Sequence, residues 1–145
     1  MLFGRLTHPE ILVALAKAGH NSRVMVADGN YPVATESSPA ASKVFLNLRR
    51  GLVTVSDVLK VLVETIPIQS AMLMEGPDGN FPPIHAEYKE LLPAGIEFTL
   101  KKRADFYAEV KSTATALVIA TGDERRFANI IITLGVVASD KSPKQ

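Results

Sequence analysis

Short apolar runs that alternate with segments of helical periodicity constrain this sequence more than any other feature. Each run holds only four or five residues, too few for a helix, and is bounded by turn-forming or polar residues. The runs cover residues 24–27, 44–48, 71–74, 96–100, 116–120 and 130–134. Strands buried on both faces of a parallel sheet have this continuous apolar character. The alternation therefore predicts a single-domain α/β fold in three layers, with helices flanking a mostly parallel sheet.

Four helices are expected between these runs. Their predicted ranges are 9–18, 55–65, 84–92 and 105–112. In the first helix, Thr7 is placed to be the N-cap, Pro9 lies in the first turn, and Gly19 follows the end. Ser56 and Asp57 are the capping candidates of the second helix.

The length of the chain limits it to one domain with one core. It has 145 residues, of which 47% are apolar and 21% are charged, as in ordinary globular proteins. We expect residues 1–138 to form this domain and the polar residues 139–145 to form a flexible C-terminal tail.

The balance of charges argues against nucleic acid as a partner. Sixteen Lys and Arg residues stand against fifteen Asp and Glu residues, and no long basic run is present. No window approaches the roughly 18 uninterrupted apolar residues of a membrane span, and Pro9 and Glu10 come too early for a signal peptide. The absence of cysteine permits a reducing compartment. We therefore expect a cytoplasmic protein that binds neither membrane nor nucleic acid.

The sequence carries no signature of a cofactor or a metal. The turn at residues 28–32 lacks the glycine spacing and the following helix of a dinucleotide site. The three histidines are not spaced as metal ligands, and no serine lies in a nucleophile elbow. His8 is expected at a helix start and His85 on a helix surface, both in structural roles. We predict neither a cofactor nor a metal site.

Polar residues stand where the predicted strands begin or end. His20 follows the first helix, Asp28 follows the first strand, and Phe127 to Asn129 precede the last strand. Ligands of parallel sheets bind beyond the ends of the strands. Each residue also has an ordinary structural role open to it, such as helix capping for His20 or turn formation for Asp28. Placement alone makes these residues candidates.

Three separated motifs follow one another along the chain. Residues 15–20 (LAKAGH) with 26–32 (VADGNYP) form the first, residues 103–107 (RADFY) the second, and residues 121–130 (TGDERRFANI) the third. Together they resemble the motifs of the fucose mutarotase and ribose pyranase family, and the resemblance extends to Val136. It implies a Rossmann-like fold of the ribose pyranase type and a sugar isomerase activity.

The resemblance implies roles for five residues. His20 would be the acid/base, and Asp28, Arg103, Phe127 and Asn129 would hold the sugar. Histidine suits the first role because both protonation forms of an imidazole are available near neutral pH. Phe127 stands where the family usually has tyrosine, so one hydroxyl is missing from the site. Arg103, where ribose-type members tend to have histidine, favours the fucose branch.

Three functions remain open on the sequence. The first is a mutarotase that interconverts the α and β anomers of fucose or a related monosaccharide. The second is a ribose pyranase, which interconverts pyranose and furanose rings, and the third is a sugar-binding or transport-accessory protein without catalysis. The resemblance also implies a homo-oligomer, up to a decamer, with its site near a subunit boundary. The high apolar content of so short a chain independently favours association.

Overall fold

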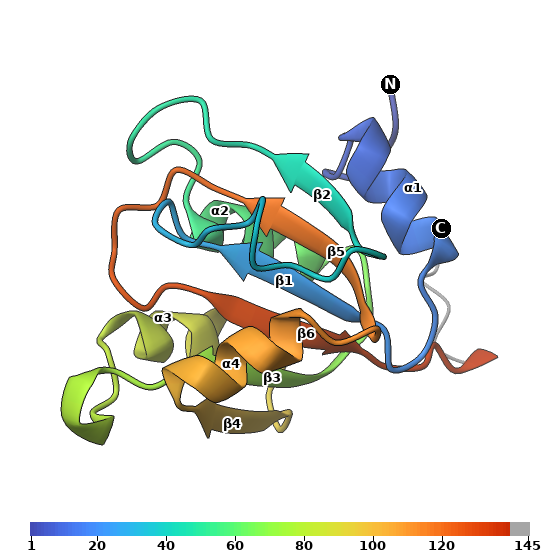
Figure 1. Cartoon of the computed structure of the whole chain (residues 1–145). Coiled ribbons are helices and arrows are strands. Elements are labelled where there is room, and N and C mark those ends of the chain that lie inside the picture. The colour runs from blue at the N-terminus through green and yellow to red at the C-terminus, as the bar shows by residue number, and fades with distance from the viewer. Residues whose placement is uncertain (140–145) are drawn as a thin grey trace.

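The computed structural model describes residues 1–139, and its elements follow the predicted alternation (Figure 1). The helices are α1 (Pro9–Lys17), α2 (Val55–Leu62), α3 (Ile84–Leu91) and α4 (Arg103–Val110), with a short helical turn η1 (Pro77–Gly79) before α3. The strands are β1 (Arg23–Ala27), β2 (Ser42–Phe45), β3 (Ile68–Met74), β4 (Glu97–Lys101), β5 (Thr115–Ala120) and β6 (Ile130–Leu134). Apart from its first residue, the predicted tail 139–145 lies outside the described residues.

The strands form one mixed sheet in the order β2-β5-β1-β6-β3-β4. Strand β1 pairs in parallel with β5, β5 with β2, and β3 with β4. Strand β6 lies between β1 and β3 and runs antiparallel to both. The other strands point the same way (Figure 1), so the prediction of an α/β domain with a mostly parallel sheet is confirmed.

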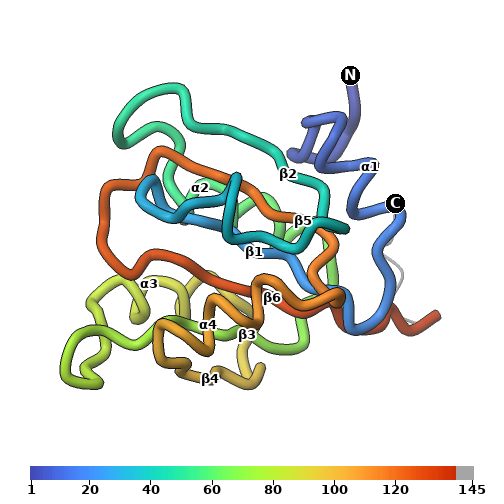
Figure 2. Tube along the Cα trace, in the orientation of Figure 1, coloured from blue at the N-terminus to red at the C-terminus, as the bar shows by residue number. Residues whose placement is uncertain are grey.

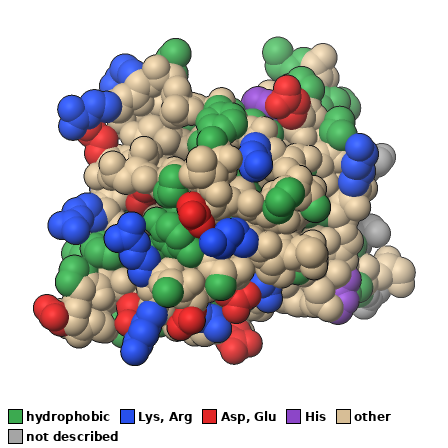
Figure 3. Space-filling model, in the orientation of Figure 1, with side chains coloured by type: hydrophobic (Ala, Val, Ile, Leu, Met, Phe, Trp, Pro, Cys, Tyr) green, Lys and Arg blue, Asp and Glu red, His purple; other side chains and the backbone are tan. Residues whose placement is uncertain are grey.

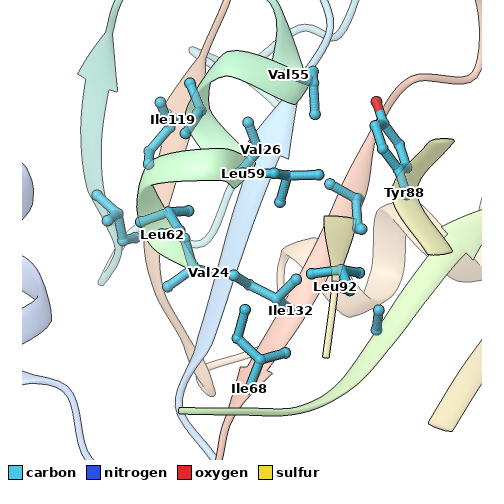
Figure 4. Packing of buried hydrophobic residues seen from close by; sticks show 14 of the residues in the cluster. Val24, Val26, Val55, Leu59, Leu62, Ile68, Tyr88, Leu92, Ile119 and Ile132 are labelled. Atoms are coloured by element: carbon cyan, nitrogen blue, oxygen red, sulfur yellow. The ribbon is translucent and has the colours of Figure 1, made fainter. Parts of the chain in front are cut away.

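The central strands β1, β5 and β6 are buried on both faces, which explains their continuous apolar runs. Along β1, Val24 and Val26 belong to a core shared with α1, α2 and α3, whereas Met25 and Ala27 belong to a second core shared with α4. Figure 4 shows α2 side chains such as Leu59 packed against the strands of the first core. Since successive side chains of a strand point to opposite faces, a strand with both faces covered must be apolar throughout.

The helix starts differ in detail from the sequence prediction. Helix α2 begins at a capping box in which Thr54 Oγ1 accepts from Asp57 N (3.1 Å) and Asp57 Oδ2 accepts from Thr54 N (2.9 Å). Ser56 is therefore inside the helix and is not its cap. In α1 the N-cap is His8 and not Thr7, and its Nδ1 accepts from Ile11 N (3.4 Å).

Turns and loops gather at the end of the sheet where β1, β4 and β5 finish. Figure 2 shows the loop between β5 and β6, residues 121–129, passing beside the turn after β1. Gly29 N in that turn donates to Asp123 O (2.8 Å). A Cβ on Gly122 would lie 2.3 Å from the carbonyl oxygen of Arg49, so this position requires glycine. The close packing brings distant parts of the sequence together at one end of the sheet.

Within residues 1–139, no helix combines the length and apolar character needed to cross a membrane.

Candidate functional site

A cavity of about 220 Å³ opens at this end of the sheet, beyond β1, β3 and β4 and before β6. We call it the candidate cavity. It is lined by Asp28, Asn30, Tyr31, Met74, Arg103, Tyr107, Arg126, Phe127 and Asn129. The fold thus brings together four of the five site residues suggested by the sequence. Because β6 is antiparallel, the start of this strand lies beside the ends of its neighbours, which puts Asn129 next to Asp28.

Asp28 and Asn129 form a buried polar pair at the base of the cavity. Asn129 Oδ1 accepts from Asp28 N (2.8 Å), and Asn129 Nδ2 donates to Asp28 Oδ2 (3.0 Å). Asp28 Oδ1 also accepts from the backbone N–H groups of Asn30 (2.9 Å) and Tyr31 (3.0 Å). Asp28 is only 4% exposed, and burial raises its pKa despite these hydrogen bonds. The pair fixes a carboxyl group that can accept a ligand hydroxyl.

Arg103 and Tyr107 form another wall of the cavity, one turn apart on α4. The Arg103 guanidinium lies 5.4 Å from the centre of the Tyr107 ring, and its Nη2 donates to the Tyr107 hydroxyl (3.4 Å). The Tyr107 ring packs against the Tyr31 ring, with their centres 4.8 Å apart. Arg103 is exposed at the first residue of the helix. Its fork of N–H groups is therefore available to a ligand in the cavity.

Phe127 has a left-handed backbone conformation, with φ of 61°. Few bulky residues adopt this conformation, and those that do so are often found at functional sites. The Arg126 guanidinium lies 5.4 Å from the centre of the Phe127 ring. The next residue is anchored from α3, because the Tyr88 hydroxyl donates to Ala128 O (2.6 Å). The backbone thus turns sharply between the half-buried Phe127 and the buried Asn129.

A network of charged side chains connects the loop of residues 121–129 to α2 and α3. The sequence did not predict it. Arg125 donates through Nε to Asp123 Oδ1 (2.9 Å), through Nη1 to Glu87 Oε2 (3.0 Å) and through Nη2 to Ser56 Oγ (3.1 Å). Asp123 is 1% exposed and also accepts from Val55 N (2.9 Å) at the start of α2. Burial alone would raise the pKa of Asp123, but Arg125 and the backbone donors hold it below its usual value. The sequence holds a trace of this network in Asp123 and Arg125, an acid and a base two residues apart in the third motif, but their partners on α2 and α3 lie far away in the chain.

His20 lies outside the candidate cavity of its own chain. It precedes β1, whereas Asp28 follows it, and the rise of about 3.3 Å per residue puts the ends of this strand more than about 13 Å apart. The His20 Nε2 is 3.1 Å from Gln69 Oε1, and Gln69 Nε2 donates to Asn21 Oδ1 (2.7 Å). His20 is thus presented at the surface of the opposite end of the sheet.

His85 is buried in α3 and does not lie on the helix surface as expected. His85 is 1% exposed, and neither nitrogen of its ring has a hydrogen-bond partner among the described residues. Burial lowers its pKa, which favours the neutral ring. The ring stands edge-on to Phe81, with ring centres 6.3 Å apart.

The chemistry of the candidate cavity suits a ligand with several hydroxyl groups. Asp28 offers acceptors, Arg103 offers donors, and the aromatic rings of Tyr107 and Phe127 offer apolar surface. Within residues 1–139, no group of three or more His, Asp or Glu side chains is placed to hold a metal ion.

Comparison with known sequences identifies relatives over nearly the whole chain. A family model described as the RbsD / FucU transport protein family matches residues 1–137. The fucose mutarotase of Bos taurus is 29% identical over 145 aligned positions, which cover 92% of this chain and 91% of that protein. The D-ribose pyranase of Photorhabdus laumondii is 28% identical over 138 positions, which cover 92% of this chain and 96% of that protein.

Solved structures share the fold. RbsD of Bacillus subtilis, complexed with D-ribose, aligns with a TM-score of 0.82 at 22% identity, over 95% of this chain and 100% of that chain. The fucose mutarotase of Streptococcus pneumoniae, in complex with L-fucose, aligns with a TM-score of 0.77 at 26% identity, over 90% of this chain and 94% of that chain. The predicted fold type is thereby confirmed.

Proposed function

Because this chain belongs to the RbsD / FucU transport protein family, whose known members include sugar isomerases, we propose that it is a mutarotase for fucose or a closely related monosaccharide. Its catalytic domain would be residues 1–138, which the family match over residues 1–137 supports. The observation that carries the proposal is the buried Asp28–Asn129 pair, which lies in one small cavity with Arg103.

The reaction requires only proton transfers at two oxygens of the sugar. A base takes the proton of the anomeric hydroxyl, an acid gives a proton to the ring oxygen, and the bond between that oxygen and the anomeric carbon breaks. The open aldehyde rotates and closes by the reverse transfers, so no proton is gained or lost overall. One positioned acid/base is sufficient, and such groups typically contribute about 10² to 10⁴-fold.

Each site residue has a part in this reaction. Asp28 accepts a hydroxyl of the sugar, Asn129 keeps the Asp28 carboxyl oriented, and Arg103 donates to sugar oxygens. Phe127 offers an apolar face where the family usually has a phenol, so binding on this side relies on ring contact.

His20 would supply the acid/base from a second copy of the chain. Its position beyond the start of β1, away from its own cavity, supports a homo-oligomer in which His20 of one copy enters the cavity of the next. The assembly could be as large as a decamer. A neighbour that closes the cavity would also exclude water from the reacting sugar.

A ribose pyranase is the second candidate. The D-ribose pyranase of Photorhabdus laumondii is 28% identical, almost the same as the bovine fucose mutarotase at 29%. Arg103, within the fucose-type RADFY motif, is the feature that favours fucose.

Magnetisation-transfer NMR tests the proposal, because it measures anomer exchange at equilibrium, where no net product forms. Addition of the protein to L-fucose is expected to accelerate exchange between the α and β anomers. His20→Ala is expected to abolish the acceleration without unfolding the protein, since His20 is exposed and packs into neither core.

The control is His8→Ala, which removes a different imidazole at the start of α1 and is expected to leave exchange intact. Acceleration with D-ribose but not L-fucose would select the pyranase. Sugar binding without any acceleration would select the sugar-binding or transport-accessory function without catalysis. Full activity of His20→Ala would refute the acid/base role of His20.

A further inference from the structure

A second, larger hollow adjoins the candidate cavity, and the proposed reaction of a monosaccharide does not use it. It encloses about 750 Å³. Arg126 and Phe127 line both spaces. The rest of its wall comes from η1, the segment after η1, α3 and the loop before β6, and includes Pro77, Phe81, Pro82, Glu87 and Arg125. We call this space the outer hollow.

The two spaces differ in the size of ligand that each accommodates. Pockets for small molecules usually enclose about 300–1,000 Å³. The candidate cavity, at about 220 Å³, suits a single sugar ring, whereas the outer hollow, at about 750 Å³, lies well within that range. A ligand that extends past Phe127 would pass from one space into the other.

The walls of the outer hollow present aromatic and proline surface. Phe81 is 61% exposed, and its ring is flanked by Lys89 Nζ, 5.0 Å from the ring centre, and by the edge of the buried His85. On the face drawn in Figure 3, apolar side chains lie between Lys and Arg side chains toward the end of the sheet to which the arrows of β1, β2 and β5 point in Figure 1. Exposed aromatic rings with polar groups beside them suit the C–H face and the hydroxyls of a sugar ring.

Two arginines line the outer hollow, and they differ in how far their charge is already paired. Arg126 is exposed, and its guanidinium lies 5.4 Å from the centre of the Phe127 ring. The Arg125 guanidinium is bound by the carboxylates of Asp123 and Glu87, with Ser56 as a further partner. Its donors are therefore committed, and the site does not offer free positive charge to a phosphate at this point. The Glu87 oxygens retain lone pairs for hydroxyl donors. Together with the exposed Arg126, these groups offer donors and acceptors to a ligand with several hydroxyl groups.

We propose that the outer hollow binds a second sugar ring, so that the substrates include reducing disaccharides. The ring with the free anomeric centre would occupy the candidate cavity, and the attached ring would lie against Phe81 in the outer hollow. The chemistry is unchanged, because the same ring opens and closes and the glycosidic bond stays intact. The inference rests on the proposed mutarotase function and names its substrate class.

The test compares anomer exchange for L-fucose and for galactosyl-fucose, in which fucose is the reducing end. The wild-type protein is expected to accelerate both, with the disaccharide at least as good a substrate at low sugar concentration. Phe81→Ala is expected to lower the ratio of disaccharide to monosaccharide exchange by about three- to tenfold, the effect of losing one ring contact. Phe45→Ala is the matched control, because Phe45 is 57% exposed on β2 and does not line the hollow.

Each outcome bears on a different part of the proposal. Acceleration of fucose exchange without acceleration of disaccharide exchange overturns the second-ring site alone, as does an unchanged ratio in Phe81→Ala. Absence of acceleration with both sugars overturns the proposed function instead. Dissociation of the assembly by Phe81→Ala in analytical ultracentrifugation shows that a second copy occupies the hollow, which also overturns the second-ring site.

Discussion

Asn129 commits both polar atoms of its side chain to one buried partner, Asp28. Its oxygen accepts from the Asp28 backbone N–H, and its nitrogen donates to the Asp28 carboxyl. A primary amide can do both at once, whereas a carboxylate can only accept. The identity of this residue therefore controls the charge and the orientation of Asp28 at the base of the cavity.

Asn129→Asp is expected to destabilise the protein more at pH 7 than at pH 5. Burial already raises the pKa of Asp28, and a facing carboxylate raises it further. A raised folded-state pKa gives stability that is present at low pH and is lost as the pH rises through that pKa. The loss of stability relative to wild type, measured by urea unfolding, should therefore be larger at pH 7 than at pH 5.

Asn129→Ala is the control for this measurement. It removes the same two hydrogen bonds, at a cost of about 1–3 kcal/mol, but adds no carboxylate. Its pH dependence should therefore be smaller than that of Asn129→Asp. Equal pH dependence in the two variants would contradict the electrostatic interpretation.

The sequence was sufficient to nominate Asp28, Arg103, Phe127 and Asn129, because these residues stand in motifs or at strand ends. It could not identify the partners of Arg125, since Glu87 and Ser56 lie on two other helices and are found only when those helices pack. The burial of His85 was missed for a similar reason. Neither the pairing of Arg125 with Glu87 and Ser56 nor the burial of His85 leaves a local pattern in the sequence.

At the scale of elements, Arg125 connects the loop of residues 121–129 to α2 and α3. Arg125→Ala removes the charged donors of Asp123, which is 1% exposed, and is expected to lower the free energy of unfolding by about 2 kcal/mol at pH 7. The lowered pKa of Asp123 gives stability that is present above about pH 4 and is lost as the pH falls through the folded-state value. Chemical denaturation should therefore show wild type and variant converging in stability below pH 4.

Arg50→Ala provides the comparison for this prediction. Arg50 pairs with Glu124 of the same loop (2.6 Å), but the Arg50 side chain is almost fully exposed. Surface ion pairs contribute only about 0–1 kcal/mol. A loss for Arg50→Ala as large as that for Arg125→Ala would mean that the buried network has no special role in holding the loop.

The alternation of elements was predictable, but the direction of β6 was not. Each apolar run overlaps a strand of the sheet, and runs such as 130–134 are strands buried on both faces. Pairing direction depends on how the chain returns to the sheet, and an apolar run reads the same in either direction. This matters for the site, since the antiparallel course of β6 is what delivers Asn129 to Asp28.

At the scale of the whole molecule, the proposed site needs two chains, and subunit mixing tests this. His20→Ala and Arg103→Ala should each be inactive at low sugar concentration. In mixed oligomers, a cavity with intact Arg103 can receive an intact His20 from its neighbour. Unfolding and refolding the two variants together in equal amounts should therefore restore exchange at about a quarter of the sites, as random association requires.

A site contained in one chain gives the opposite result, because every subunit of the mixture then lacks one essential side chain. Refolding each variant alone is the control and should restore nothing. Dilution of the wild-type protein to monomers should also abolish exchange if the site lies between chains.

The order of the sheet also determines when this protein can fold during its synthesis. Strand β1 is made before both of its neighbours, because β5 and β6 follow it by about 90 to 110 residues along the chain. Strand β6 is moreover the one that joins β2-β5-β1 to β3-β4. The nascent chain therefore carries an unpaired apolar strand until β5 and β6 have been made. A chain that stops before Ile130 would leave the two halves of the sheet unconnected, and such exposed strands are targets for chaperones and for aggregation.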